Sequence, residues 1–454
     1  MENNIKIQFL GAAGTVTGSK YLIQTPTKNI LVDCGLFQGL KKLRLLNWDK
    51  LPVNVPKIDM VLLTHGHLDH VGYLPRLVTQ GFEGPVWGTE PTLEIAKIIL
   101  EDSARIQEED AERANAEGFS KHKPAKPLYD TKDVENTLPL FHPQPLDKWI
   151  EIDKEIFCRF RYNGHILGAT FIELKIGTKI IVFSGDIGRE KDLLLYPPQK
   201  PEKADILLIE STYGDRLQPD NAEERLAEII NNAVQKQGTI IIPSFAVERA
   251  QTLMYLLWKL RKKGAIPNLP VYMDSPMGSN VLDVFEHNST WHKLPMQECR
   301  EMLKDIKQIR SIQETYKLAA SDKPKIIIAA SGMASGGRVL TYFVQYLGKS
   351  STTVLLVGYQ AEGTRGRALL DGAKEVKLFG KFFPVKALVE NLEGLSAHTD
   401  QKGLIGWVSL LKQKPEHVFI VHGESQAADA LRVKFKDVYG WDCEIPSLNQ
   451  TVNI

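Results

Sequence analysis

The chain has 454 residues, 43% of them hydrophobic and 24% charged, and a formal net charge of +1. These values describe a globular protein of about two or three domains, and they exclude a globally basic surface, so any polyanion must bind at a local patch. The four cysteines lie far apart without a CxxC pair, which excludes a thiolate zinc finger and favours reduced thiols in a cytoplasmic protein. No apolar run approaches membrane-spanning length, so we expect no membrane association.

The first segments alternate between strand-like runs and glycines. Residues 5–10 predict a strand that ends in the glycine-rich stretch 11–18. Such glycines can bind a dinucleotide, but that motif should open a helix, and two more strand-like runs follow instead. Tight turns are therefore the better interpretation. Asp33 ends the last of these strands, where it is either an ordinary turn cap or a carboxylate that orients a metal-bound histidine.

The segment Thr64–His70 contains His65, His67, Asp69 and His70, directly after an apolar run that predicts a buried strand. His65 and His67 are two residues apart in extended chain, so both imidazoles can point to one side and share an ion. Asp69 and His70 are adjacent on a turning backbone, which suits a second ion. Two ions roughly 3.5–4 Å apart form a clamp that hydrolyses phosphate esters or amides. A solvated histidine-rich loop is the alternative, but the nearby aspartate disfavours it.

Two further ligand types follow a long helical pattern over Thr92–Asn115. Short strands are expected over residues 155–160, 171–175 and 179–183. His165 lies between the first two, flanked by glycines, and Asp186 follows the third in a Ser-Gly-Asp-Ile-Gly segment. Together with the first cluster they supply a third histidine and a carboxylate able to bridge two ions.

The pattern changes after the buried strand 204–210, which ends at Glu210. Helices over Ala222–Gln235, Ala246–Lys262 and Gly336–Tyr346 alternate with strand-like runs at 239–242, 271–273, 325–329 and 353–357. This alternation predicts a parallel, helix-covered sheet in a second domain. Two glycine-rich loops of this domain, 330–338 and 358–367, carry arginines and predict phosphate contacts, although each loop alone is equally consistent with a flexible turn.

The last section returns to ligand-type residues. His398 stands just before an expected helix, and His422 follows an apolar strand and precedes a glycine. Of the eleven histidines, six occupy such loops: His65, His67, His70, His165, His398 and His422. We expect the other five to be structural.

This chain resembles the metallo-β-lactamase fold in its metal motifs, which are the 65–70 segment, His165 and Asp186, with Asp33 ahead of them. The segment 210–214, the inserted domain with Ser331, and His398 and His422 resemble the beta-CASP nucleases, in particular the cleavage-and-polyadenylation endonuclease type and its bacterial and archaeal relatives. The resemblance covers essentially the whole chain. Because the sequence begins at its first strand, we expect it to lack the KH domains of the archaeal relatives. As a separate departure from the family, we expect no long C-terminal tail.

The resemblance implies an α/β architecture, an αββα metallo-β-lactamase sandwich with an inserted parallel-sheet beta-CASP domain. The metallo-β-lactamase domain would comprise residues 1–212 and 391–454, and the beta-CASP domain residues 213–390. The implied cofactors are two Zn²⁺ ions. One would bind His65, His67 and His165, the other would bind Asp69, His70 and His422, and Asp186 would bridge them.

The activity implied by the resemblance is hydrolysis of single-stranded RNA by a metal-bridging hydroxide, leaving a 5′-phosphate and a 3′-hydroxyl. Asp69, His398 and Glu210 would be the catalytic residues. His398 is the expected acid, because an imidazole can be protonated near neutral pH, and Glu210 would orient it and raise its pKa. The flanking phosphates would be bound by Ser331, Arg338, Arg365 and Arg367.

Two other functions are compatible with the same motifs. The first is a hydrolase of small thioesters or lactones, which the inserted domain disfavours because a small substrate needs no such groove. The second is a non-catalytic processing subunit, which the complete set of ligand residues disfavours. The sequence leaves open whether cleavage is internal or from an end, whether RNA is preferred over DNA, and whether the chain forms a homodimer.

Overall fold

The computed structural model describes residues 5–118, 122–245 and 247–454. The chain divides into two compact units: unit 1 comprises residues 1–217 and 398–454, and unit 2 comprises residues 218–397. Each unit has its own sheets and its own hydrophobic core. In these described ranges, every helix is too short or too polar to cross a membrane.

The first sheet of unit 1 has the strand order β21-β1-β2-β3-β4-β5-β6. The C-terminal strand β21 pairs antiparallel with β1, so the end of the chain completes the sheet that its beginning starts. From β3 to β6 the strands run parallel. The bounds are β1 Lys6–Phe9, β2 Tyr21–Gln24, β3 Asn29–Val32, β4 Met60–Leu62, β5 Val86–Gly88, β6 Phe141–Pro143 and β21 Thr451–Asn453.

The second sheet of unit 1 has the order β20-β11-β10-β9-β8-β7. Strands β10, β11 and β20 are parallel neighbours, so their carboxyl ends lie at the same edge. Buried side chains from both sheets, among them Phe9 of β1 and Leu208 of β11, form the core between them. The bounds are β7 Ile150–Asp153, β8 Ile156–Tyr162, β9 Thr170–Ile176, β10 Lys179–Phe183, β11 Ile206–Glu210 and β20 His417–Val421.

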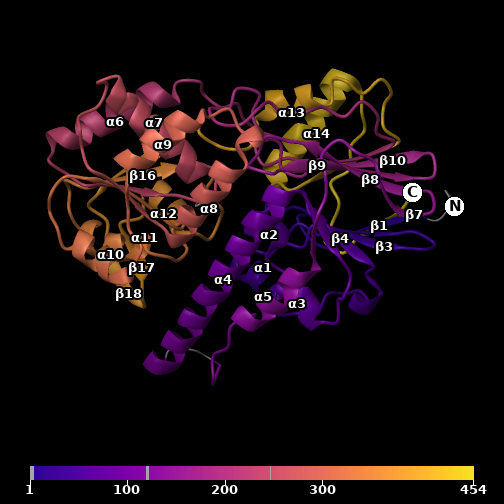
Figure 1. The fold of residues 1–454 in the computed structure, drawn as a ribbon, viewed down its shortest axis with the longest axis horizontal. Coiled ribbons are helices and arrows are strands. Elements are labelled where there is room, and N and C mark those ends of the chain that lie inside the picture. The colour runs from indigo at the N-terminus through magenta and orange to yellow at the C-terminus, as the bar shows by residue number, and fades with distance from the viewer. Residues whose placement is uncertain (1–4, 119–121, 246) are drawn as a thin grey trace. The chain divides into compact units, whose positions relative to one another are not determined.

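Helices cover the outer faces of this sandwich (Figure 1). Trp407 of α13 and Leu431 of α14 pack with β11 and β20 in a second buried cluster. The longest helix, α4, buries an apolar stripe along its first half and begins at a Thr89 side-chain cap. The bounds are α1 Lys41–Leu46, α2 Leu68–Val71, α3 Leu74–Thr79, α4 Glu90–Glu117, α5 Thr131–Thr137, α13 Gln401–Trp407 and α14 Ser425–Tyr439.

Unit 2 is built on a parallel sheet of order β14-β13-β15-β12-β16-β19, together with the β17–β18 hairpin. Its central strands β12 and β15 are fully buried runs of isoleucine, as expected of a sheet with helices on both faces. The strand bounds are β12 Ile240–Pro243, β13 Val271–Asp274, β14 Lys307–Gln308, β15 Ile326–Ala329, β16 Thr353–Val357, β17 Glu375–Leu378, β18 Lys381–Pro384 and β19 Leu388–Leu392. The helix bounds are α6 Ala222–Gln235, α7 Arg249–Lys262, α8 Pro276–His287, α9 Met296–Asp305, α10 Ile312–Ala319, α11 Val339–Tyr346 and α12 Arg365–Leu370.

This architecture confirms the predicted fold class, an αββα sandwich with a separate parallel-sheet domain. Helix α6 has the predicted bounds. Helix α11 begins at Val339 rather than at Gly336, because Gly337 has a φ of +73° that an α-helix does not accommodate. The expected first residue of α7, Ala246, lies outside the described residues.

Candidate metal centre

The sandwich brings the predicted ligand residues to the carboxyl ends of its strands. The 65–70 segment follows β4, His165 lies between β8 and β9, Asp186 follows β10, and His422 follows β20. Because β10, β11 and β20 are adjacent and parallel, Asp186, Glu210 and His422 meet at one edge of the second sheet. Six histidines and several acids that are distant in sequence therefore lie together in unit 1.

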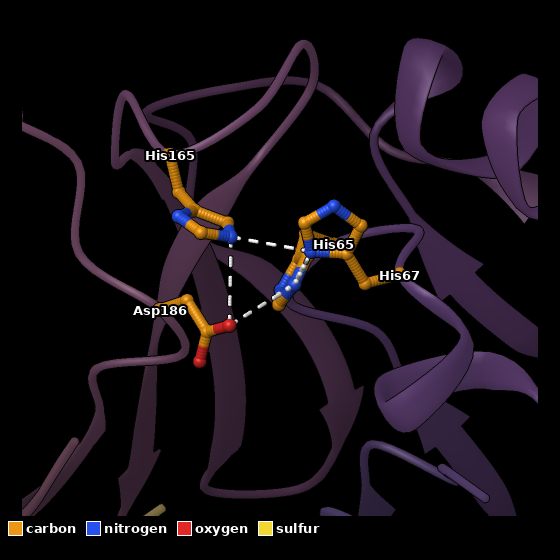
Figure 2. Close-up of side chains that lie close together, drawn as sticks. All are labelled: His65, His67, His165 and Asp186. Atoms are coloured by element: carbon orange, nitrogen blue, oxygen red, sulfur yellow. Dashed lines mark hydrogen bonds and ion pairs between the residues drawn. The ribbon is translucent and has the colours of Figure 1, made fainter. Parts of the chain in front are cut away.

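The first cluster consists of His65, His67, His165 and Asp186, whose side chains point toward one another in Figure 2. The Nδ1 atom of His67 lies 3.2 Å from the Nε2 atoms of both His65 and His165. The Oδ2 atom of Asp186 lies 3.4 Å from Nε2 of His65 and 3.5 Å from Nε2 of His165. Ligands held about 2.0–2.2 Å from a tetrahedral zinc ion stand roughly 3.3 Å from one another. The spacing of this cluster therefore fits a tetrahedral metal ion.

The second cluster consists of Asp69, His70 and His422, together with the other oxygen of Asp186. The Nε2 atoms of His70 and His422 are 3.2 Å apart, and Oδ2 of Asp69 lies 3.4 Å from Nε2 of His422. The Oδ1 atom of Asp186 lies 3.4 Å from Nε2 of His70. The spacing matches that of the first cluster, so these atoms could hold a second ion.

Asp186 links the two clusters, because each of its carboxylate oxygens faces one of them. The residue is 2% exposed, and its Oδ1 atom accepts no hydrogen bond from any residue that the structure describes. Burying an ionised carboxylate is costly unless it is paired or coordinates a metal ion. An oxygen left without a donor between two imidazole clusters fits a bridging ligand.

The protonation states of the first cluster suit metal binding. Burial lowers the pKa of His65 and of His165 well below the usual value, and burial lowers the pKa of His67 to about 4. These imidazoles are neutral at pH 7 and offer the lone pair that coordination requires. His70 differs: burial lowers its pKa, but the carboxylates of Asp186 and Asp33 outweigh burial and hold the pKa above its usual value. A metal ion at the second cluster would compete with that proton.

Polar contacts are made at the Nδ1 atoms of His65 and His70, whose Nε2 atoms face the clusters. Oδ2 of Asp33 lies 2.8 Å from Nδ1 of His70, and the same carboxylate accepts hydrogen bonds from the backbone N–H and the hydroxyl of Thr64. The Thr64 hydroxyl also lies 3.1 Å from Nδ1 of His65. Such contacts fix which ring nitrogen is left for a metal ion. Asp33 thus contacts a candidate ligand, and its role in orienting a metal-bound histidine stays a prediction.

Two threonines at this site were missed by sequence reasoning. Thr64 contacts Asp33 and His65, and the Thr212 hydroxyl lies 3.2 Å from Nδ1 of His422. Threonine carries no spacing signal of its own. The only available clue was its position next to a strand end and beside a ligand-rich segment.

Glu210 and His398 form a separate pair beside the clusters. Oε2 of the fully buried Glu210 lies 3.0 Å from Nδ1 of His398. The Nε2 atom of His398 faces Asp186, with 3.9 Å between Nε2 and Oδ2. Burial lowers the pKa of His398. The carboxylates of Glu210 and then Asp186 raise it by more than burial lowers it, so the pKa lies above its usual value. The pair places an imidazole beside both clusters with one ring nitrogen directed toward them.

The four predicted phosphate-binding residues lie in unit 2, where each has contacts within that unit. Ser331 Oγ accepts a hydrogen bond from the Ser335 backbone N–H at 3.0 Å. Arg338 forms an ion pair of 2.6 Å with Asp274, which is fully buried. The guanidinium of Arg365 donates to backbone carbonyls, and that of Arg367 pairs with the Asp371 carboxylate at 3.0 Å. Phosphate binding by these residues stays a prediction.

Three family descriptions match the chain in succession. The metallo-beta-lactamase superfamily matches residues 13–240, the Beta-Casp domain residues 250–369, and the Zn-dependent metallo-hydrolase RNA specificity domain residues 383–446. The fold and the site thus define a metallo-hydrolase of the metallo-β-lactamase superfamily. The chain belongs to the beta-CASP nucleases of that superfamily, and it is a metal-dependent hydrolase.

Relatives in bacteria and archaea support this assignment. The chain is 32% identical over 436 residues to Ribonuclease TTHA0252 of Thermus thermophilus. The aligned region covers 94% of this chain and 95% of the relative. It is also 32% identical over 464 residues to Transcription termination factor FttA of Methanocaldococcus jannaschii, covering 95% of this chain and 69% of the relative. A solved structure of a protein of unknown function from Enterococcus faecalis V583 shares the fold, with a TM-score of 0.52 and 13% identity, covering 99% of this chain and 100% of that one.

Proposed function

We propose that this chain is a zinc-dependent ribonuclease that hydrolyses phosphodiester bonds of single-stranded RNA and leaves a 5′-phosphate and a 3′-hydroxyl. The observation that carries the proposal is the position of Asp186, whose two oxygens each lie 3.4 Å from an imidazole nitrogen of a different cluster. The ribonuclease among its relatives supports RNA as the substrate. The free thiols and those relatives support a cytoplasmic location.

The residues present suit two zinc ions. His65, His67 and His165 would hold one ion, Asp69, His70 and His422 would hold the other, and Asp186 would contact both. Imidazole and carboxylate are ligands that zinc accepts. Two such ions would supply a nucleophile derived from water near neutral pH and positive charge for the phosphate oxygens.

The protein's own contribution to the reaction centres on His398 and Glu210. The sugar oxygen that leaves phosphorus is a poor leaving group and needs a proton. When Nδ1–H of His398 donates to Glu210, the other ring nitrogen, Nε2, faces the clusters and can carry a second proton for that oxygen. The Glu210 carboxylate stabilises the charged imidazolium and fixes the ring. Glu210 is itself held by the backbone N–H of Ile187.

The proposal is tested with purified protein of known metal content and three substrate types. Labelled single-stranded RNA should be cleaved, whereas a panel of thioesters and lactones should not. Hydrolysis of the panel without cleavage of RNA would instead establish a small-molecule hydrolase. Circular and end-labelled RNA compared in parallel then separate internal cleavage from 5′-exonuclease action, because a circle has no end to start from.

A further inference from the structure

The short helix α1 and the residues after it leave apolar side chains on the surface of unit 1. Helix α1, Lys41–Leu46, contains no buried residue. Leu45 is 54% exposed, and Trp48, just beyond the helix, is 50% exposed. Short helices in proteins are stabilised mainly by packing an apolar face against the rest of the fold. This segment instead presents an aromatic ring and an aliphatic side chain to solvent.

The same segment carries unpaired positive charge. Residues 41–50 contain Lys41, Lys42, Arg44 and Lys50 but only one acid, Asp49, and all five are exposed. Within the described part of the chain, none of the four cations forms an ion pair. The whole chain has a net charge of only +1, so this is a local excess of positive charge.

Hydrogen bonds hold the backbone of residues 41–50 in place at Asn47 and Asp49. Asn47 is buried, and its side-chain oxygen accepts a hydrogen bond from the Phe37 N–H at 2.9 Å while its amide donates to the Phe37 carbonyl at 2.8 Å. The Tyr73 hydroxyl donates to the carbonyl of Asp49 at 2.9 Å. The exposed cations and the Trp48 ring are therefore presented by a backbone that is held on both sides.

The residues just before this segment contact the backbone of the second ligand cluster. The Leu36 N–H donates to the Leu68 carbonyl at 3.1 Å, and a Cβ on Gly35 would lie 1.6 Å from the carbonyl oxygen of Asp69, so the two backbones touch. The Asp69 side chain is 18% exposed, the most exposed carboxylate of the clusters, so this side of the site faces solvent. At about 3.6 Å per residue, Lys41 lies within about 18 Å of Leu36.

We propose that residues 41–50 form a contact surface for single-stranded RNA, an inference that rests on the proposed function. Lys41, Lys42 and Arg44 contact backbone phosphates, and the ring of Trp48 stacks on a base. Cations interleaved with an exposed aromatic ring are the combination that binds single strands with little sequence preference. The surface would hold the strand a few nucleotides from the bond that is cleaved.

The test measures binding separately from cleavage. A fluorescent, fully 2′-O-methylated oligonucleotide that resists hydrolysis is titrated with the wild-type protein and with the triple variant K41Q/K42Q/R44Q. We expect Kd to rise about tenfold, and the slope of log Kd against log salt to fall by about 2, because each lost phosphate contact removes about 0.7 from the slope for single strands. Trp48→Ala should weaken binding about tenfold without changing the slope, and Trp48→Phe should restore most of it.

The matched control is K154Q/K412Q/K434Q, which removes three exposed charges from other parts of unit 1. Its Kd should stay within about twofold of wild type. Equal weakening by both triple variants, or none by either, would overturn the proposal. So would a K41Q/K42Q/R44Q protein that keeps its RNA affinity but no longer binds vesicles of phosphatidylcholine and phosphatidylserine in equal parts, which would make the surface a membrane contact.

The outcome is also separable from the proposed function. A wild-type protein that binds the oligonucleotide through this surface but cleaves no unmodified RNA would contradict the proposed ribonuclease activity and support the contact surface. A wild-type protein that cleaves RNA, and whose binding is unchanged by the K41Q/K42Q/R44Q substitutions, would support the proposed ribonuclease activity and contradict the contact surface.

Discussion

The Nδ1 atom of His398 lies 3.0 Å from Oε2 of Glu210, so a buried carboxylate fixes the orientation of an imidazole whose other nitrogen faces Asp186, the residue shared by the two ligand clusters. Glu210 ends β11, and His398 stands two residues before the cap of α13, so the pair joins two elements that are far apart in sequence. In the sequence, neither residue stands beside another candidate ligand as the residues of the 65–70 segment do. We propose that this pair acts as a positioned proton donor, although the Glu210 carboxylate also lies close enough to Asp186 and His422 to share a metal ion with them.

Replacing His398 by Ala should separate acid catalysis from metal binding. We expect kcat on RNA to fall by a factor of about 10²–10⁴, the usual contribution of a general acid. The metal content, measured by inductively coupled plasma mass spectrometry, should equal that of wild type. Loss of metal in this variant would show that His398 is a ligand.

Replacing Glu210 by Gln should act through His398. The amide keeps an oxygen that can accept the Nδ1–H hydrogen bond but removes the charge that stabilises the imidazolium. We expect kcat to fall about tenfold or more, and the double variant H398A/E210Q to be no slower than H398A alone. Additive losses in this cycle would mean that Glu210 contributes independently of His398.

Replacing Arg338 by Ala decides between two roles for this residue. Its guanidinium pairs with Asp274, and removing it leaves that buried carboxylate without its cation. Such a loss costs about 3 kcal/mol, which lowers the Tm of a unit of this size by about 10 °C. Arg367→Ala is the control, because its ion pair is exposed and should change the Tm little. If R338A melts like wild type and only raises KM for RNA, Arg338 binds phosphate as the sequence predicted.

The buried Lys20 predicts a pH dependence of stability. Burial lowers the pKa of Lys20 to about 8, from 10.5 for an exposed lysine, and its ammonium donates to the Gly35 carbonyl at 2.6 Å. Because the folded-state pKa lies below the unfolded one, the folded state binds fewer protons between about pH 8 and pH 10.5. The contribution of Lys20 therefore becomes more favourable as pH rises through that window.

The change amounts to about 3 kcal/mol, because each pKa unit corresponds to about 1.4 kcal/mol. Lys20→Met removes the titrating group. Unfolding free energies are measured by urea titration at a series of pH values for both proteins. The free energy of unfolding of the variant minus that of wild type should be about 3 kcal/mol larger at pH 7.5 than at pH 10.5. A difference that does not change with pH would mean that the pKa of Lys20 is not lowered in the folded protein.

The sequence predicted the parts of this protein that depend on local signals. A buried strand followed by a ligand-type residue is such a signal, and it predicted His65, Asp186 and His422 at strand ends, where the structure has them close together. Strand–helix alternation likewise predicted the parallel sheet of unit 2. In both cases the residues that carry the signal are neighbours in sequence.

Features that depend on tertiary contacts were not predictable in this way. A lysine is expected at the surface, yet Lys20 is 1% exposed because the Phe37 and Tyr73 rings and the Gly35 carbonyl surround its ammonium. Arg338 was predicted to contact substrate from its glycine-rich loop. The buried Asp274 that pairs with it ends strand β13, 64 residues earlier in the chain, so the sequence around position 338 could not predict this ion pair.

The most direct test of the metal-dependent nuclease combines metal analysis with RNA cleavage in wild type and Asp186→Asn. Wild-type protein should contain about two zinc ions per chain, as the two clusters around Asp186 imply, and should cleave single-stranded RNA to products with 5′-phosphates. The Asp186→Asn protein should lose metal and cleavage together. A wild-type protein that holds its full complement of zinc and leaves every single-stranded RNA intact would contradict the account.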